Sequence, residues 1–241
     1  MKKILILGSK PGATIPAEVD YVYAANASAH FYKGNISPRS KLIIVASAGV
    51  MYRIDLSKKP KFYKIIDALR DSFVVSGVDK IPGAKEKICH EVNVKSIKYY
   101  SAEARRKIFN SVVGGYFISP IFLSFIHGKI EPSYFLKYLY HLARGKWKNA
   151  DLPGQYRPST ALFALAYAIS EHSADSQFIV TGIGFDRRES YPDGGDVENQ
   201  KHHLIPDTLY FSELRNRYQI KTTDALISKQ FSIPLQMSGP E

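Results

Sequence analysis

The chain has 241 residues, of which 45% are apolar and 23% are charged, and both values are ordinary for a globular domain. They exclude an intrinsically disordered chain and a collagen-like array. Cys89 is the single cysteine, which excludes an internal disulfide framework and a cysteine-based zinc finger and is typical of a reducing compartment.

Positive charge is concentrated in the first part of the chain. The 33 Lys and Arg against 22 Asp and Glu give a net charge of +11. Residues 1–150 contain 25 basic and 10 acidic residues, a net charge of +15, whereas residues 151–241 contain 8 and 12, a net charge of −4. Such a field attracts nucleic acid, an anionic membrane surface or phosphorylated substrates, and charge alone does not choose among them.

No segment is apolar for long enough to cross a membrane. The apolar run after Lys3 stops at Gly8, which is too short for a signal peptide, and glycine, serine and proline interrupt the most apolar window, residues 112–126. We therefore expect no transmembrane segment and a cytoplasmic protein, either free or peripheral at the inner face of the cytoplasmic membrane.

Short, continuous apolar runs rich in β-branched residues predict strands that are buried on both faces. They cover residues 3–7, 21–25, 41–46 and 178–183, and residues 220–223 indicate a short last strand. Strands of this kind belong to parallel sheets flanked by helices.

Helices are predicted between these strands. Residues 159–171 are apolar almost all round and begin with capping chemistry at Ser159, and a second helix follows Asp207, whose carboxylate is expected to cap it. A helix over residues 133–144 is expected to place Phe135, Leu136, Leu139 and Leu142 inward. The alternation predicts an α/β, Rossmann-like, mostly parallel sheet with helices on both faces. We interpret residues 1–241 as a single domain, with about 100–150 as a helical insertion.

In an open parallel sheet the ligand lies beyond the carboxyl ends of the strands. The residues at these ends are Gly8–Gly12, Asn26, Ser47 and Gly182–Asp186. Glycines in the first turn would let backbone amides approach a phosphate, and a neighbouring helix N-terminus would add positive dipole. The pattern is neither G-x-G-x-x-G nor a P-loop, and Asn26 stands where a dinucleotide site needs an acid, which disfavours a dehydrogenase. A plain strand-to-helix turn is the alternative.

His202 and His203 lie between the fourth strand and the helix that follows Asp207. An imidazole is partly neutral at physiological pH and suits a general base, and a solvated loop histidine is the alternative. The acidic residues of the loop 186–198 are interpreted as solvated rather than as a cation site, so no metal is expected.

The ordered set of motifs resembles the CMP-sialic-acid-dependent sialyltransferases and the bacterial CMP-Kdo-dependent transferases. The set comprises strand-Gly-x-x-Pro-Gly, strand-Asn26, Arg157-Pro158-Ser159-Thr160 opening a buried helix, strand-Gly182-Ile183-Gly184-Phe185-Asp186, His202 with Asp207 five residues on, and residues 220–224. The resemblance covers the first 50 residues and about residues 155–228.

This resemblance implies a single-domain transferase that needs no metal or cofactor and uses a CMP-sugar as donor. It places the cytidine nucleotide on Gly8, Ser9, Asn26, Ser159 and Thr160, lines the site with Gly184 and Asp186, and matches His202 to the general base. The first turn departs from the family's Gly-Asn-Gly-Pro-Ser, since Ser9 replaces the Asn and Gly12 the Ser. The segment between Asp186 and His202 is also shorter than the family's lid, so the lid contacts do not carry over.

The expected reaction moves a sialic-acid-like or Kdo-like sugar to a cell-surface glycan or glycolipid. Arg187, Arg188 and Tyr191 are candidates to stabilise the leaving phosphate. His202 as base gives inversion, whereas retention would need Asp186 near the anomeric carbon.

Basic and aromatic residues interleave over 129–148, which suits contact with an anionic membrane surface, and a solvated helix face is the alternative. A non-catalytic or nucleic-acid-binding basic Rossmann-like protein is the competing interpretation of the whole chain. No nucleic-acid partner is expected, because no helix-turn-helix, RRM or zinc motif is present.

Overall fold

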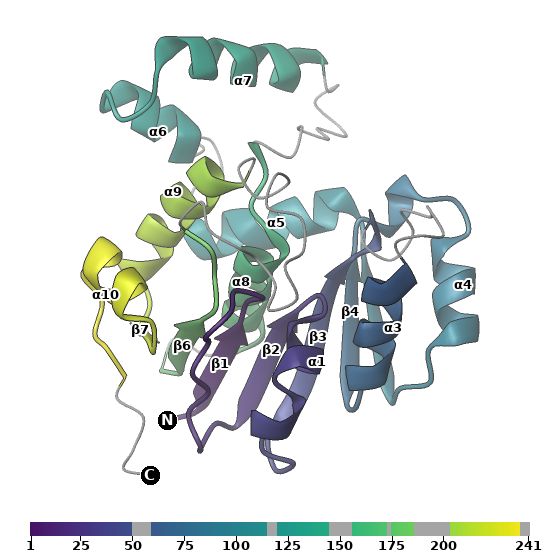
Figure 1. Ribbon diagram of the computed structural model, residues 1–241. Helices are drawn as coiled ribbons and strands as arrows, with labels where there is room; N and C mark the ends of the chain where they lie inside the picture. Colours follow the sequence, from purple (N-terminus) through teal and green to yellow (C-terminus); the bar gives the residue numbers. More distant parts are fainter. Residues whose placement is uncertain (50–58, 115–119, 145–155, 173–174, 186–202, 237–241) are drawn as a thin grey trace.

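The computed structural model describes residues 1–49, 59–114, 120–144, 156–172, 175–185 and 203–236 (Figure 1). The strands are β1 (Lys3–Leu7), β2 (Tyr21–Ala25), β3 (Lys41–Ser47), β4 (Ser72–Ser76), β5 (Ser96–Tyr100), β6 (Gln177–Thr181) and β7 (Ile220–Thr222). The α-helices are α1 (Ser28–Phe31), α3 (Lys59–Ala68), α4 (Ala84–Glu91), α5 (Ala102–Val113), α6 (Pro120–Ile126), α7 (Pro132–Arg144), α8 (Thr160–Glu171), α9 (Leu204–Arg215) and α10 (Ala225–Phe231). Two short 3-10 helices are η1 (Lys33–Asn35) and η3 (Val78–Lys80).

The strands form one seven-stranded parallel sheet in the order β5-β4-β3-β2-β1-β6-β7. Ile4 of β1 lies opposite Tyr21 of β2 on one side and Phe178 of β6 on the other. Strands β1 to β5 are added in one direction across the sheet, and β6 and β7 are then added on the other side of β1. The direction of winding therefore reverses between β1 and β6, and the predicted α/β, Rossmann-like class is confirmed.

Helices cover both faces of the sheet because its strands are apolar on both. Ile4 and Ile6 of β1 face one apolar cluster, which includes α5, α8, α9 and α10, whereas Leu5 and Leu7 face a second cluster with α1, α3 and α4. Eight consecutive residues of α8, Leu162–Ile169, are buried, as its nearly all-round apolar sequence predicts. This helix is the centre of its layer and packs against β1, β2 and β3.

The connection from β1 to β2 contains no helix, so the expectation of a strand-to-helix turn after Gly8 is wrong. Residues 8–20 run directly to β2, with Ile15 and Val19 packed against the second apolar cluster. Pro11, Gly12 and Pro16 interrupt this segment, and the Gly12 backbone is left-handed, with φ of +74°. The helix dipole expected beside the first turn must therefore come from another element.

Two predictions about helices also need correction. Helix α9 begins at Leu204, so Asp207 lies inside its first turn and does not cap it. On α7, Phe135 is buried and Leu142 is partly buried as expected, but Leu136 and Leu139 are 64% and 38% exposed. Buried Tyr138 takes the inward position because the helix packs against Tyr156, far along the chain.

Strands β4 and β5 lie in a stretch that the sequence left uninterpreted, whereas helix α5 lies within residues 100–150, the predicted helical insertion. Helix α5 belongs to the layer of α8, where Phe109, Val112 and Val113 join the first apolar cluster. Among the elements of residues 100–150, it is α6 and α7 that stand away from the sheet (Figure 1).

Candidate functional site

The turns that follow β1 and β6 lie against each other at the point where the winding of the sheet reverses. The Gly8 amide donates to the Thr181 carbonyl at 2.9 Å, and the Lys10 amide donates to the Gly182 carbonyl at 2.9 Å. A Cβ on Gly8 would collide with the Gly182 carbonyl, so the contact between the two turns already requires glycine there. In open α/β sheets, ligands bind beyond the carboxyl ends of the strands at such a switch point.

Polar groups stand at this edge on the neighbouring turns. Ser9 is partly buried, and its hydroxyl has no hydrogen-bond partner among the described residues. Asn26 has a left-handed backbone, with φ of +51°, and its Oδ1 accepts from the Ser47 amide at 3.4 Å. Gly184 is partly exposed between buried Ile183 and Phe185. This edge therefore exposes polar groups, with buried apolar side chains beneath them.

Helices α8 and α9 begin at the same edge, because each leads into a parallel strand and must run back along the sheet. Ser159 caps α8: its Oγ accepts from the Leu162 amide at 3.3 Å, and its own amide donates to Oδ1 of Asp207 at 2.6 Å. Within the described chain, the amides of Thr160 and Ala161 have no acceptor, and the first turn of α8 has no acidic residue. Two donors and the positive end of the helix dipole are thus left for an anion.

Asp207 is the buried partner of this helix start and is 2% exposed. Burial raises its pKa to about 7, while the hydrogen bonds from Ser159 and the charge of Arg105 act in the opposite direction. The carboxyl therefore changes charge near neutral pH rather than near its ordinary value.

Arg105, on α5, supplies positive charge beneath the same turn, a role that no sequence pattern indicated. Its Nη2 donates to the carbonyls of Pro158 at 2.6 Å and Ser159 at 3.1 Å, and its guanidinium lies 4.9 Å from the Phe163 ring centroid. Burial, together with the charge of the nearby Arg157, lowers its pKa to about 10, although Asp207 acts in the opposite direction. Arg105 therefore remains charged at neutral pH.

His203 joins the start of α9 to the segment before α8. Its Nδ1 lies 2.7 Å from the Arg157 carbonyl, which can only accept, so Nδ1 carries a proton. The neutral ring then has its lone pair on Nε2, the arrangement that a base requires.

Several residues singled out from the sequence lie outside the described residues. They are the proposed catalytic pair and the lid residues, namely His202, Asp186, Arg187, Arg188 and Tyr191. Of the predicted nucleotide contacts, Gly8, Ser9, Asn26, Ser159, Thr160 and Gly184 are described, and all of them lie at the carboxyl edge of the sheet.

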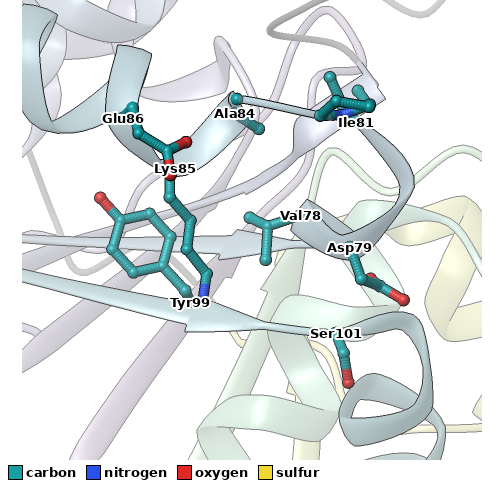
Figure 2. A pocket seen from close by; sticks show the side chains of 10 residues that line it. Val78, Asp79, Ile81, Ala84, Lys85, Glu86, Tyr99 and Ser101 are labelled. Atoms are coloured by element: carbon teal, nitrogen blue, oxygen red, sulfur yellow. The ribbon is translucent and has the colours of Figure 1, made fainter.

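A cavity of about 360 Å³ lies elsewhere on this edge, beyond β4 and β5. Figure 2 shows Asp79 and Ser101 on one side of it and Lys85, Glu86 and Tyr99 on the other. It contains none of the residues that the sequence singled out. Asp79 is engaged within the protein, since its Oδ1 accepts from the Ala102 amide at 2.9 Å.

In the described part of the chain, no group of three or more His, Cys, Asp or Glu side chains is placed to hold a metal ion. Nor does that part of the chain contain a helix with the length and apolarity to span a bilayer.

No family model matches the chain, and no curated protein or solved structure is significantly similar to it.

Proposed function

We propose that the chain is a glycosyltransferase that moves a sialic-acid-like or Kdo-like sugar from a CMP donor to a glycan or glycolipid. One observation carries the proposal. Gly8–Ser9 and Ser159–Thr160, which the resemblance to CMP-sugar transferases matches to the nucleotide site, lie at one edge of the sheet. At this edge the winding of the sheet reverses, and α8 begins with two amides that have no acceptor among the described residues.

The donor phosphate fits the start of α8. The Thr160 and Ala161 amides would donate to its oxygens, and Arg105 and Arg157 would supply positive charge from behind and beside the turn. A hydrogen bond to a charged group contributes roughly 1.5–3 kcal/mol, so two such bonds suffice for a specific phosphate contact. Ser9 and Asn26, with polar atoms on the adjacent turns, would contact the nucleoside.

The transfer step then needs a base and a stabilised leaving group. The acceptor oxygen forms a bond to the anomeric carbon, the bond from that carbon to the CMP phosphate breaks, and CMP leaves with the electron pair. His202 would take the acceptor proton, and Arg187, Arg188 and Tyr191 would offset the growing charge on the phosphate. Attack opposite the leaving group inverts the anomeric centre, whereas Asp186 acting as a nucleophile would give retention.

Ligand selectivity tests the nucleotide part of the proposal. Thermal unfolding would be followed with CMP, UDP, NAD and S-adenosylmethionine in turn. At a concentration of ~100 Kd, a ligand of the native state adds about 2.7 kcal/mol to the free energy of unfolding. We expect a rise in Tm with CMP alone. A rise with NAD or S-adenosylmethionine and none with CMP would overturn the proposal, as would salt-dependent binding of DNA or RNA that CMP does not affect.

The adjacent histidines provide a matched test of the base. Transfer would be assayed from CMP-N-acetylneuraminic acid and from CMP-Kdo to a set of glycan acceptors. His202→Ala should keep CMP binding and lose transfer by roughly a hundredfold or more, the range expected for loss of a general base. His203→Ala is the comparison variant and should retain more activity. Unchanged transfer by His202→Ala would remove this residue from the mechanism.

A further inference from the structure

Helices α6 and α7 form a hairpin, and among the described residues its apolar core lies on its inner face. Ile121, Phe135 and Tyr138 are buried there against Tyr156, and the Phe125 and Phe135 rings stack with their centroids 4.0 Å apart. Leu209 of α9 completes this small core and joins the hairpin to the rest of the molecule. The sheet arrows point toward the side on which the hairpin lies, and α7 is outermost (Figure 1).

The outer face of α7 carries an apolar stripe. Leu136 and Tyr140 of α7 are 64% and 54% exposed, and Leu139 is 38% exposed. Residues three and four apart share one face of a helix, so these three side chains form a stripe. On α6, Ile126 is 60% exposed, and Phe122, which is 37% exposed, also packs against Phe135, with the ring centroids 5.6 Å apart. Of the ten large apolar side chains exposed in the described part of the chain, five are therefore on these two helices.

The charges beside this stripe are mostly positive. Lys129, Lys137 and Arg144 are exposed and are opposed in residues 120–144 only by Glu131. Lys137 and Arg144 lie seven residues apart and so share one face. The Arg144 guanidinium lies 5.3 Å from the Tyr140 ring centroid and donates to the Tyr140 hydroxyl, which holds the cation beside the apolar stripe.

We propose that the outer face of α6 and α7 docks on an anionic phospholipid bilayer. A helix that lies in a membrane interface needs an apolar stripe to enter the acyl boundary, cations beside it to meet anionic headgroups, and tyrosine at the level of the headgroups. Leu136 and Leu139 supply the first, Lys137 and Arg144 the second, and Tyr140 the third.

Charge favours this occupant over the two others that could cover the stripe. A second copy of the chain packed face to face would bring Lys137 and Arg144 against the same cations of its partner. A nucleic acid would use the cations but would leave exposed leucines without an apolar counterpart. A bilayer with anionic lipid can contact both the apolar stripe, through its acyl chains, and the cations, through its headgroups.

Vesicle flotation tests the apolar stripe. The full chain would be mixed with vesicles of phosphatidylcholine alone or with about 30% phosphatidylglycerol. We expect binding to the anionic vesicles only, and Leu136→Glu/Leu139→Glu should lower it by roughly tenfold or more. Leu226→Glu is the matched control, because Leu226 is 52% exposed on α10, away from the hairpin, and this variant should bind as the wild type. Equal binding by the wild type and the double variant, or none by the wild type, would overturn the proposal.

Salt and charge reversal test the cationic part. Lys137→Glu should weaken binding to the anionic vesicles, whereas Lys229→Glu on α10 should not. Raising the salt from about 0.15 M to about 0.5 M should weaken wild-type binding, since the Debye length falls below about 8 Å. Sedimentation velocity without lipid separates the other occupant: a wild-type dimer that Leu136→Glu/Leu139→Glu dissociates would identify an interface between copies and refute the proposal.

This inference does not depend on the proposed nucleotide site. The shift of Tm by CMP would be measured on every hairpin variant. Lost vesicle binding with an unchanged CMP shift supports the membrane surface by itself, and a failed CMP shift in the wild type leaves the vesicle result standing.

Discussion

Helices α5 and α8 start at the same edge of the sheet with the same serine cap, yet they differ in the donors that remain. Among the described residues, the start of α8 leaves the amides of Thr160 and Ala161 without an acceptor, and the start of α5 leaves only that of Glu103. In α5, Ser101 Oγ accepts from the Ala104 amide at 3.0 Å and Asp79 accepts from the Ala102 amide, while Glu103 adds negative charge in the first turn. In α8, Ser159 caps in the same way, but buried Asp207 accepts from the amide of the cap residue itself.

The acid accepts from the first helical residue in α5 and from the cap residue in α8, and this difference decides what each helix N-terminus can bind. The acid at α5 takes an amide of the first turn, so the protein itself neutralises that helix end, next to the cavity of Figure 2. The acid at α8 accepts from the Ser159 amide instead, and the Thr160 and Ala161 amides have no acceptor among the described residues. A helix start is thus an anion site only when its own acids are placed elsewhere.

The glycine turns near the two helix starts also differ, because one is closely packed and the other is open. Gly8 is fixed by the Gly182 carbonyl, whereas Gly77, which follows β4 with φ of +75°, has no atom within 4 Å of its would-be Cβ. The turns of β1 and β6 are therefore one packed unit.

The largest effect is expected at this packed unit. Gly8→Ala forces the backbone of the two turns apart and should lower the free energy of unfolding by roughly 3 kcal/mol. Gly77→Ala should cost only about 1 kcal/mol, the strain of a left-handed backbone. Urea denaturation measures both, with Gly34→Ala as the control, since it meets no atom within 4 Å and has no positive φ. Equal losses for Gly8→Ala and Gly77→Ala would contradict the close packing.

Removing the buried acid should have the next largest effect. Asp207→Ala leaves the Ser159 amide without its acceptor and should lower the free energy of unfolding by about 2 kcal/mol. The exposed Asp79 of the other helix start serves as the comparison, and Asp79→Ala should cost less than about 1 kcal/mol, because water can replace it.

The pH dependence of stability tests the state of Asp207. Its pKa rises from about 4 in the unfolded chain to about 7 in the fold, so its contribution is fully present below pH about 4 and is lost as the pH rises through about 7. The steepest loss is about 1.4 kcal/mol per pH unit. Asp207→Asn should remove this loss and gain stability relative to the wild type as the pH rises. A constant difference between the two proteins from pH 4 to pH 8 would show that the carboxyl titrates normally.

The smallest effect is expected from the two caps. Ser101→Ala and Ser159→Ala each remove one capping hydrogen bond and should each cost about 1 kcal/mol. Only Ser159→Ala should also weaken CMP binding in calorimetric titration. Equal weakening by both variants would mean that the two helix starts do not differ in function.

The sequence predicted the elements that carry their own signal. Strands β1, β2, β3 and β6 are continuous apolar runs, and α8 is apolar all round behind a serine cap. Strand β4 has only three apolar residues, Phe73–Val75, and β5 is a half-exposed edge strand that includes Lys98, so neither run stood out.

The site could be predicted only in part, because its central features depend on distant contacts. The switch point follows from strand order, which the apolar runs do not contain. Asp207 is a residue type that often caps helices, yet its carboxylate accepts a hydrogen bond from the amide of Ser159, 48 residues away. Arg105 is an ordinary helical arginine until α5 packs against α8. Sequence patterns report local periodicity, whereas the roles of Asp207 and Arg105 depend on contacts with residues that are distant in the sequence and that only the fold brings close.

The most direct test of the central claim removes one amide donor and changes little else. Thr160 occupies the first position of α8, where proline is tolerated, and the preceding Ser159 has ψ of 170°, a conformation that proline accepts. Ala225 holds the same position in α10 and provides the control. Calorimetric titration should show that Thr160→Pro binds CMP roughly tenfold or more weakly than the wild type, while Ala225→Pro binds it equally. Undiminished CMP affinity in a folded Thr160→Pro variant would contradict a phosphate site at the start of α8.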